Sequence, residues 1–310
     1  MIEINLRYKN YNSLSESKVE ILKSNIQFLL SNTPLPSTIP LQIIITDNFT
    51  KDIHDFQKQY KLQKEGHSEN AIGKAFSIKN EKNAVLHFIF LNAVNFDKLL
   101  QSEWDDFPLE FNFVHHELGH VYDNQNTFSV IPEAFYKHKE LTRIEWFLYE
   151  VSSLSWAEFQ ANFIATRTIT KSSLEHYFSE LIMVLENLDN RLARAKQEII
   201  SDNSNCLEIQ FLVKDFFYFG AQVIGLLIGL GINKENEYYN NSWLELGKKY
   251  DLESIFILLF DAFEGLQSSY PNWESFHILN PINQCILMLL NNKGISVNEK
   301  LIFSIISPTD

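Results

Sequence analysis

A run of 17 residues without a formal charge, from Phe216 to Ile232, constrains the fold of this 310-residue chain more than any other feature. The apolar surface of such a helix must be covered by protein or by lipid, because its exposure to water is unfavourable. A membrane-spanning helix needs about 20 apolar residues, whereas this run is slightly shorter and contains Gln222. Gly225 and Gly229 form a GxxxG pair, which permits close helix packing in either environment. We therefore predict a buried core helix, and membrane contact is the less favoured alternative.

Charge and cysteine content narrow the class of protein. The formal net charge is −13 and no dense run of Lys or Arg is present, which disfavours nucleic-acid binding because the phosphate backbone would be repelled. Two cysteines, Cys206 and Cys285, imply neither a disulfide framework nor a thiolate metal cage. The first residues lack the apolar segment of a signal peptide, so we expect a soluble protein of the reducing cytoplasm. The oligomeric state is left open.

Two kinds of hydrophobic pattern divide the chain. Within the first 100 residues, segments of period-two or continuous apolar pattern alternate with segments of helical periodicity. The strands are expected at residues 2–8, 41–46, 74–79 and 84–91, and the helices at 15–30 and 51–62. The last two strands fit a hairpin, of which 84–91 is buried on both faces. The strand at 74–79 suits a sheet edge that can pair with an extended peptide.

From about Phe107 the pattern is almost entirely helical, with a long helix at residues 141–169. Residues 124–139 are polar and are expected to form a loop at the rim of a cleft. The prediction is an α+β fold in two lobes: residues 1–170 with a small mixed sheet, and an all-helical lobe over 171–310.

His116-Glu117-Leu118-Gly119-His120 carries the clearest chemistry in the chain. Residues four apart on a helix lie one turn above each other, so both imidazoles can reach one ion. Zinc accepts neutral imidazole nitrogens and keeps a position for water at catalytic sites, where Glu117 can act as general base. Composition alone gives roughly 0.02 occurrences of this pattern in such a chain. Two core histidines without a metal are the weaker interpretation.

A third protein ligand must come from a later helix, because the third histidine of the metzincin pattern does not follow. Glu158 shares a helix face with Ala161, Asn162 and Ala165, and the small alanines permit close approach to the histidine helix. Asn162 can orient a histidine through its second ring nitrogen.

Two other glutamates on the same predicted helix compete for the role of ligand. Glu145 and Glu150 precede Glu158, and bulky side chains such as Phe147 and Tyr149 surround Glu150. We therefore predict Glu158 as the third ligand, with a solvated helix glutamate as the alternative.

His116-Glu-Leu-Gly-His120 followed by Glu158-Phe-Gln-Ala-Asn162 resembles the gluzincin zinc metallopeptidases, whose members carry H-E-x-x-H and then E-x-x-A-[D/N]. It is similar in particular to their compact cytosolic branches, including peptidases that cleave phage-type repressors. The resemblance covers residues 116–120 and 158–165. It implies a zincin-like lobe with Zn²⁺ held by His116, His120 and Glu158, Glu117 as the catalytic base and Asn162 beside the ligands.

The function expected from the motif and the resemblance is zinc-dependent cleavage of peptide or protein substrates. A zinc-binding regulatory module and a metallohydrolase of a non-peptide amide are the alternatives, and an intact Glu117 favours catalysis over a closed structural site. Arg167, His176 and Tyr177 are open candidates for stabilising the oxyanion.

Overall fold

The computed structural model describes residues 2–7, 15–36, 38–62, 72–80, 84–95, 97–103, 106–130, 141–202 and 207–306. The fold is mixed α+β, with a small sheet and a large majority of helix, as the sequence predicts. Two compact units are present, residues 1–125 with 164–173 and residues 126–163 with 174–310. Each unit consists of two separate segments of the chain. The boundary between two lobes that the sequence analysis expects at residue 170 stays a prediction.

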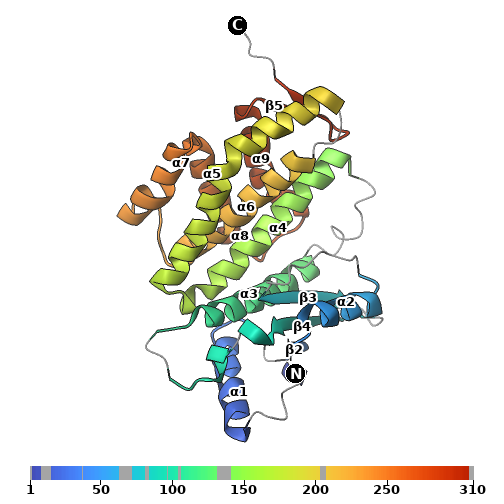
Figure 1. Cartoon of the computed structure of the whole chain (residues 1–310), viewed down its shortest axis with the longest axis vertical. Coiled ribbons are helices and arrows are strands. Elements are labelled where there is room, and N and C mark those ends of the chain that lie inside the picture. Colours follow the sequence, from blue (N-terminus) through green and yellow to red (C-terminus); the bar gives the residue numbers. More distant parts are fainter. Residues whose placement is uncertain are drawn as a thin grey trace. The chain divides into compact units, whose positions relative to one another are not determined.

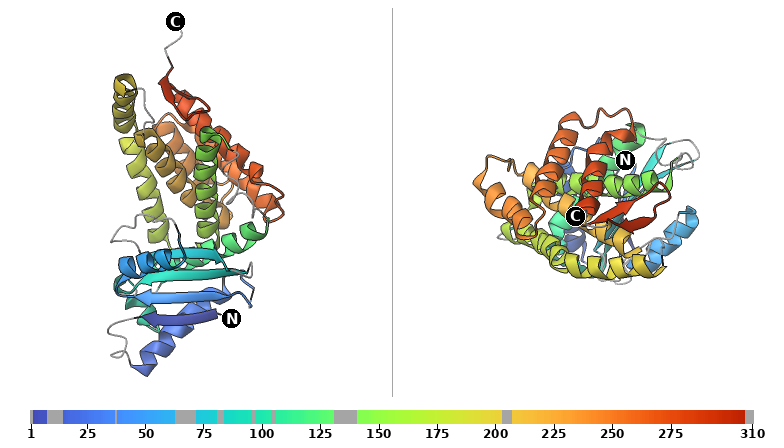
Figure 2. Two further views of the ribbon diagram at one scale, coloured as in Figure 1. Left: turned by 90° about the vertical axis from the view of Figure 1, so that its right-hand side faces the viewer. Right: turned by 90° about the horizontal axis from the view of Figure 1, so that it is seen from above.

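The first unit is built on a four-stranded sheet of order β1-β2-β4-β3 (Figures 1 and 2). Neighbours β1 and β2, and also β2 and β4, are parallel, while β3 is antiparallel to β4. Its elements are β1 (Ile2–Arg7), α1 (Glu16–Ser31), β2 (Leu41–Thr46), α2 (Phe49–Gln59), β3 (Gly73–Lys79), β4 (Val85–Asn92), 3-10 turns at Ala93–Asn95 and Asp97–Leu100, and α3 (Leu109–Val130). Among the described residues β3 is therefore an edge strand, the place predicted for it.

Helices cover both faces of this sheet. On one face α1 and α3 pack against the strands through side chains such as Ile26 and Val114. On the other face Ile53 and Phe56 of α2 pack against Phe88 and Phe90 of β4. Strand β4 is buried on both sides, which is why its sequence is a near-continuous apolar run rather than an alternation.

The β3–β4 hairpin turns without a glycine at its tip. The side chain of Asn80 accepts a hydrogen bond from the Ala84 amide at 2.9 Å, and the Asn80 amide donates to the Ala84 carbonyl at the same distance. These two hydrogen bonds close the hairpin at Asn80 and Ala84. Residues 81–83, between the two strands, lie outside the described residues.

The second unit is helical apart from one small sheet. Figure 1 shows the long helices α4, α5 and α6 running alongside one another. Its elements are α4 (Arg143–Ala165), α5 (Lys171–Asp202), α6 (Leu207–Gly229), a π-helical segment Tyr239–Leu244, α7 (Glu245–Lys249), α8 (Glu253–Ser269), a 3-10 turn Phe276–Leu279, α9 (Asn280–Asn292), β5 (Ile295–Val297) and β6 (Phe303–Ile305). A 3-10 turn, Thr166–Thr168, follows α4.

Helix α6 contains most of the charge-free run. It is the one helix in the described part of the chain that is long and apolar enough to cross a membrane, and 67% of its most apolar window is buried inside the protein. Buried residues extend along it from Ile209 to Leu227. Such burial is typical of the core helix of a soluble protein, in keeping with the sequence prediction.

Two expectations about the helical part were wrong. The second lobe is not all helical, because β5 and β6 pair as a two-stranded antiparallel sheet. Gly294, with φ of 70°, ends α9 and turns the chain into β5, and strands of three residues are too short to show a period in the sequence. The segment 124–139 does not begin as a loop, since α3 continues to Val130, and mostly polar residues without Gly or Pro at 124–130 are compatible with a helix as well as with a loop. Residues 131–140 lie outside the described residues.

Candidate metal site

Helix α3 places two histidines on one face by packing its other face into the core. Phe111, Leu118 and Val121 are fully buried in the cluster that joins α1, the sheet and α3. His116 and His120, four residues apart, therefore lie together on the face of α3 that points away from this core. Their ring centroids are 4.6 Å apart and their ring planes are at 88°. His116 is only 8% exposed, whereas His120 is half-buried.

Glu158 of α4 joins this pair. One ring nitrogen from each of His116 and His120 and one carboxylate oxygen of Glu158 all lie within 4.8 Å of one another. The carboxylate is almost completely buried, at 4% exposure, which is costly for a charged group unless it is paired or binds a metal. The three residues form a group that could hold a metal ion, and it is the one such group among the residues that the structure describes.

Glu117 lies against the first residue of the edge strand. A Cβ atom added to Gly73 of β3 would lie 2.8 Å from Glu117 Cγ and 2.9 Å from its Oε1. Real Cβ atoms essentially never make such short contacts, so a side chain at position 73 would displace Glu117. The glutamate is half-buried, and the backbone of Gly73 covers one side of it.

Asn162, predicted to orient a histidine ligand, makes a bond within α4. Its Nδ2 donates to the backbone carbonyl of Glu158 at 3.1 Å, and its side chain is fully buried. The Oδ1 atom is buried and has no hydrogen-bond partner among the described residues. The acceptor that the predicted role requires is thus available, and the role stays a prediction.

The two other glutamates of α4 have structural partners. Glu145 accepts hydrogen bonds from the amide and the hydroxyl of Thr142 at 2.8 and 2.7 Å, which caps the start of the helix and lowers the pKa of Glu145. Glu150 is exposed and forms an ion pair with Lys214 at 2.7 Å. Neither belongs to the group of His116, His120 and Glu158.

Two further buried histidines have core roles. His115 precedes the pair but is fully buried, with Nδ1 3.1 Å from the Thr168 hydroxyl, and burial lowers its pKa to about 4. His87 of β4 lies between Ser77 Oγ, 2.8 Å from its Nδ1, and Gln125 Oε1, 2.9 Å from its Nε2. Burial also lowers the pKa of His87, so both rings are held in the neutral form at pH 7.

The candidates for oxyanion stabilisation remain open. Arg167 lies in the 3-10 turn after α4, and Tyr177 is buried in α5 with its ring 5.8 Å from that of His176. Nothing in these positions selects one of them.

Sequence reasoning missed two residues beside the site. Gln222 of α6 donates from Nε2 to Glu158 Oε2 at 2.7 Å, and Gly73 contacts Glu117 as described. The sequence could have indicated Gln222, since it is an amide within the charge-free run and a polar group in a buried helix requires a hydrogen-bond partner. The sequence gives no indication that Gly73 contacts Glu117, because glycines in strands are also common at bulges and bends away from functional groups.

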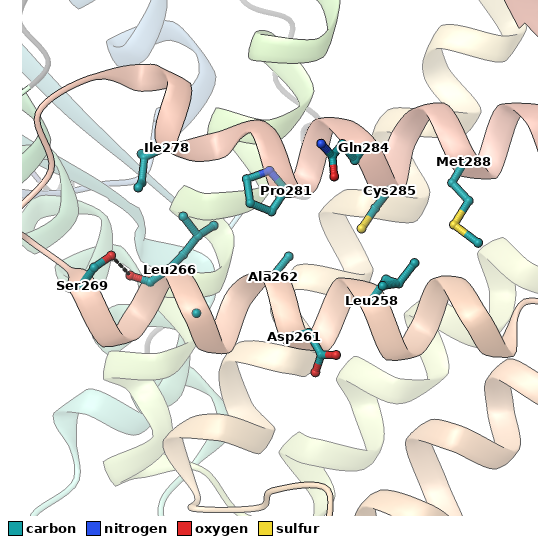
Figure 3. A pocket seen from close by; sticks show the side chains of 11 residues that line it. Leu258, Asp261, Ala262, Leu266, Ser269, Ile278, Pro281, Gln284, Cys285 and Met288 are labelled. Carbon is teal, nitrogen blue, oxygen red and sulfur yellow. Dashed lines mark hydrogen bonds between the residues drawn. The ribbon is translucent and has the colours of Figure 1, made fainter.

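A pocket of about 530 Å³ lies between α8 and α9, inside the second unit (Figure 3). Side chains such as Leu266 of α8 and Pro281 and Cys285 of α9 point into it, whereas the Asp261 carboxylate points away from α9 and pairs with Lys234. Burial raises the pKa of the Cys285 thiol to about 12, so it is no nucleophile at neutral pH. The pocket lining contains none of the metal-site residues.

Comparison of the chain with protein-family models, curated proteins and solved structures finds no match.

Proposed function

We propose that this chain is a soluble zinc-dependent metallopeptidase with a zincin-like lobe, in which His116, His120 and Glu158 hold the metal and Glu117 is the general base. One observation carries the proposal: two imidazoles on one helix face and a buried carboxylate converge within 4.8 Å. We assign it to the cytoplasm because of its cysteine content and because its most apolar helix is mostly buried.

The donor set suits zinc. Two neutral imidazoles and one carboxylate are the ligands of a catalytic zinc site that keeps a position for water, whereas structural zinc sites are normally closed by four protein ligands. Zinc bound there would supply Lewis acidity and lower the pKa of water. Magnesium and calcium fit less well, since they prefer oxygen ligands.

The remaining steps belong to residues of the chain. Glu117, next to His116 in sequence, accepts the proton of the attacking water and delivers it to the leaving amine. Gly73 covers the Glu117 side chain with backbone alone, which keeps the carboxylate close to the edge of the sheet while limiting its exposure to solvent. His116 and Glu158 are largely buried and therefore held in place.

The edge strand favours peptide over other amides. Strand β3 has β4 as its neighbour on one side and ends the described sheet on the other, so its backbone groups on that side can pair with an extended chain. Since Gly73 contacts Glu117, a peptide that paired with β3 would pass close to the base. The net charge of −13 supports a protein or peptide partner rather than nucleic acid.

The test is proteomic cleavage profiling of the wild-type protein against Glu117→Gln in the same lysate. Glutamine keeps the size of the side chain but accepts no proton, so zinc should be retained while cleavage falls at least ~100-fold. Unchanged cleavage by the variant would show that the motif performs no chemistry. Zinc retention with no cleavage by either protein would favour the regulatory module.

A further inference from the structure

Helix α6 delivers one polar side chain to the candidate metal site. Gln222 is 6% exposed, and its neighbours along the buried helix are apolar or glycine. Its amide Nε2 lies 2.7 Å from Oε2 of Glu158, a carboxylate that is itself only 4% exposed. Hydrogen bonds to a charged acceptor are short and strong, and inside a protein they strongly restrict the acceptor's orientation.

A glycine one turn further along α6 brings this amide within reach. A Cβ at Gly225 would clash with the carbonyl oxygen of Phe159 and lie 3.2 Å from Cβ of Asn162. Both contacts are with α4, close to the turn that carries Glu158. The backbones of α6 and α4 can approach this closely only because position 225 has no side chain, and residues three apart share a helix face. Gly225 therefore sets the distance across which Gln222 contacts Glu158.

The chemistry of the contact suits a metal ligand. A lysine or arginine in place of Gln222 would neutralise the carboxylate and compete with a cation for it, whereas an apolar side chain would leave a buried oxygen without this hydrogen bond. A neutral amide donates to one oxygen and leaves in place the negative charge that attracts a cation. Carboxylate ligands of metals are commonly held by hydrogen bonds of this kind.

We infer that Gln222 is a positioning residue for the metal site: it holds one oxygen of Glu158 so that the other binds the metal. Gly225 maintains the helix separation that this contact requires. The inference rests on the proposed function, because it takes Glu158 to be a metal ligand. It adds α6, which is far from the motif in sequence, to the parts of the chain that determine metal affinity.

The test measures zinc affinity of the full chain by competition with a chromogenic chelator. Gln222→Met keeps the side-chain length and removes the donor, so zinc should bind about 10- to 100-fold more weakly. The matched control is Gln160→Met, since Gln160 is a buried glutamine of α4 whose amide bonds to Gln267 of α8 instead. It should keep wild-type zinc affinity even if it lowers the melting temperature.

Cobalt substitution gives a readout that general destabilisation would not change. The visible absorption bands of bound Co²⁺ should differ between wild type and Gln222→Met, and should be the same in wild type and Gln160→Met. If Gln222→Met does not fold, Gln222→Asn replaces it, because its amide is one methylene too short to reach Glu158 and the same weakening is expected.

Glycine variants test the helix separation. Gly225→Ala should weaken zinc binding, whereas Gly220→Ala on the same helix should not, since a Cβ at position 220 meets only Leu259 Cδ2 at an ordinary 3.6 Å. Wild-type affinity in Gln222→Met or Gln222→Asn, with zinc bound by wild type, would overturn the positioning role. Failure of the wild-type protein to bind zinc would instead refute the proposed function.

Discussion

Replacing Gly73 by alanine should displace the predicted base, Glu117, and slow catalysis without loss of zinc. The added Cβ would lie 2.8 Å from Glu117 Cγ, and ordinary contacts begin at 3.4 Å, so the glutamate must move by about 0.6 Å. Misplacement of a reacting group by about 1 Å can cost ~100-fold in rate. We therefore expect kcat/KM of Gly73→Ala to fall roughly 10- to 100-fold, with zinc content unchanged.

The assay is cleavage of whichever peptide the proteomic profile of the wild-type protein identifies, at matched zinc occupancy. Because the added Cβ clashes with Glu117, the melting temperatures of Gly73→Ala and wild type are compared to show that the loss does not reflect unfolding. Gly265→Ala is the control, because a Cβ there meets nothing within 4 Å. Wild-type activity in Gly73→Ala would refute the proposal that Glu117, held against Gly73 of β3, is the base.

The remaining predictions concern the third ligand and a buried histidine. Glu158→Ala should lower zinc affinity at least ~100-fold in chelator competition, whereas Glu150→Ala, which only breaks the ion pair of the exposed Glu150 with Lys214, should leave it nearly unchanged; the reverse result would discard the ligand assignment. Burial lowers the pKa of His87 below 6.5 in the folded protein. As the pH drops below 6.5, the unfolded chain therefore binds a proton at His87 before the folded protein does. The free energy of unfolding should fall by up to about 1.4 kcal/mol per pH unit. The free energy of unfolding, measured with urea at pH 5 and pH 7, should differ less between the two pH values for His87→Gln than for wild type. Equal differences would contradict the lowered pKa of His87.

Local patterns predicted the first unit well because its elements are long enough to show their periods. The strand Leu41–Thr46 was predicted with the observed bounds, and the hairpin of β3 and β4 was confirmed in its order and antiparallel sense. Ser15, expected near the start of the first helix, is its N-cap and accepts a hydrogen bond from the Lys18 amide. The group that could hold a metal ion also followed from local spacing, since i and i+4 on a helix fix two of its three members.

The parts that sequence did not predict depend on contacts between distant segments. The hydrogen bond from Gln222 to Glu158 joins residues 64 apart, and nothing in either helix alone specifies its partner. The close contact of Gly73 with Glu117 likewise depends on where the sheet packs against α3. The small β5–β6 sheet depends on two left-handed backbone positions, Gly294 and Leu301, of which only the glycine is suggested by residue type.

Metal content tests the central claim most directly. Protein purified without exposure to chelator should carry close to one zinc ion per chain. His116→Ala and His120→Ala should each lose the zinc ion, since these residues are two of the three proposed ligands, and both variants should remain folded. Elemental analysis by inductively coupled plasma mass spectrometry measures all three proteins on the same scale. Substoichiometric zinc in the wild-type protein that added metal does not restore, together with His116→Ala behaving like wild type, would contradict the account.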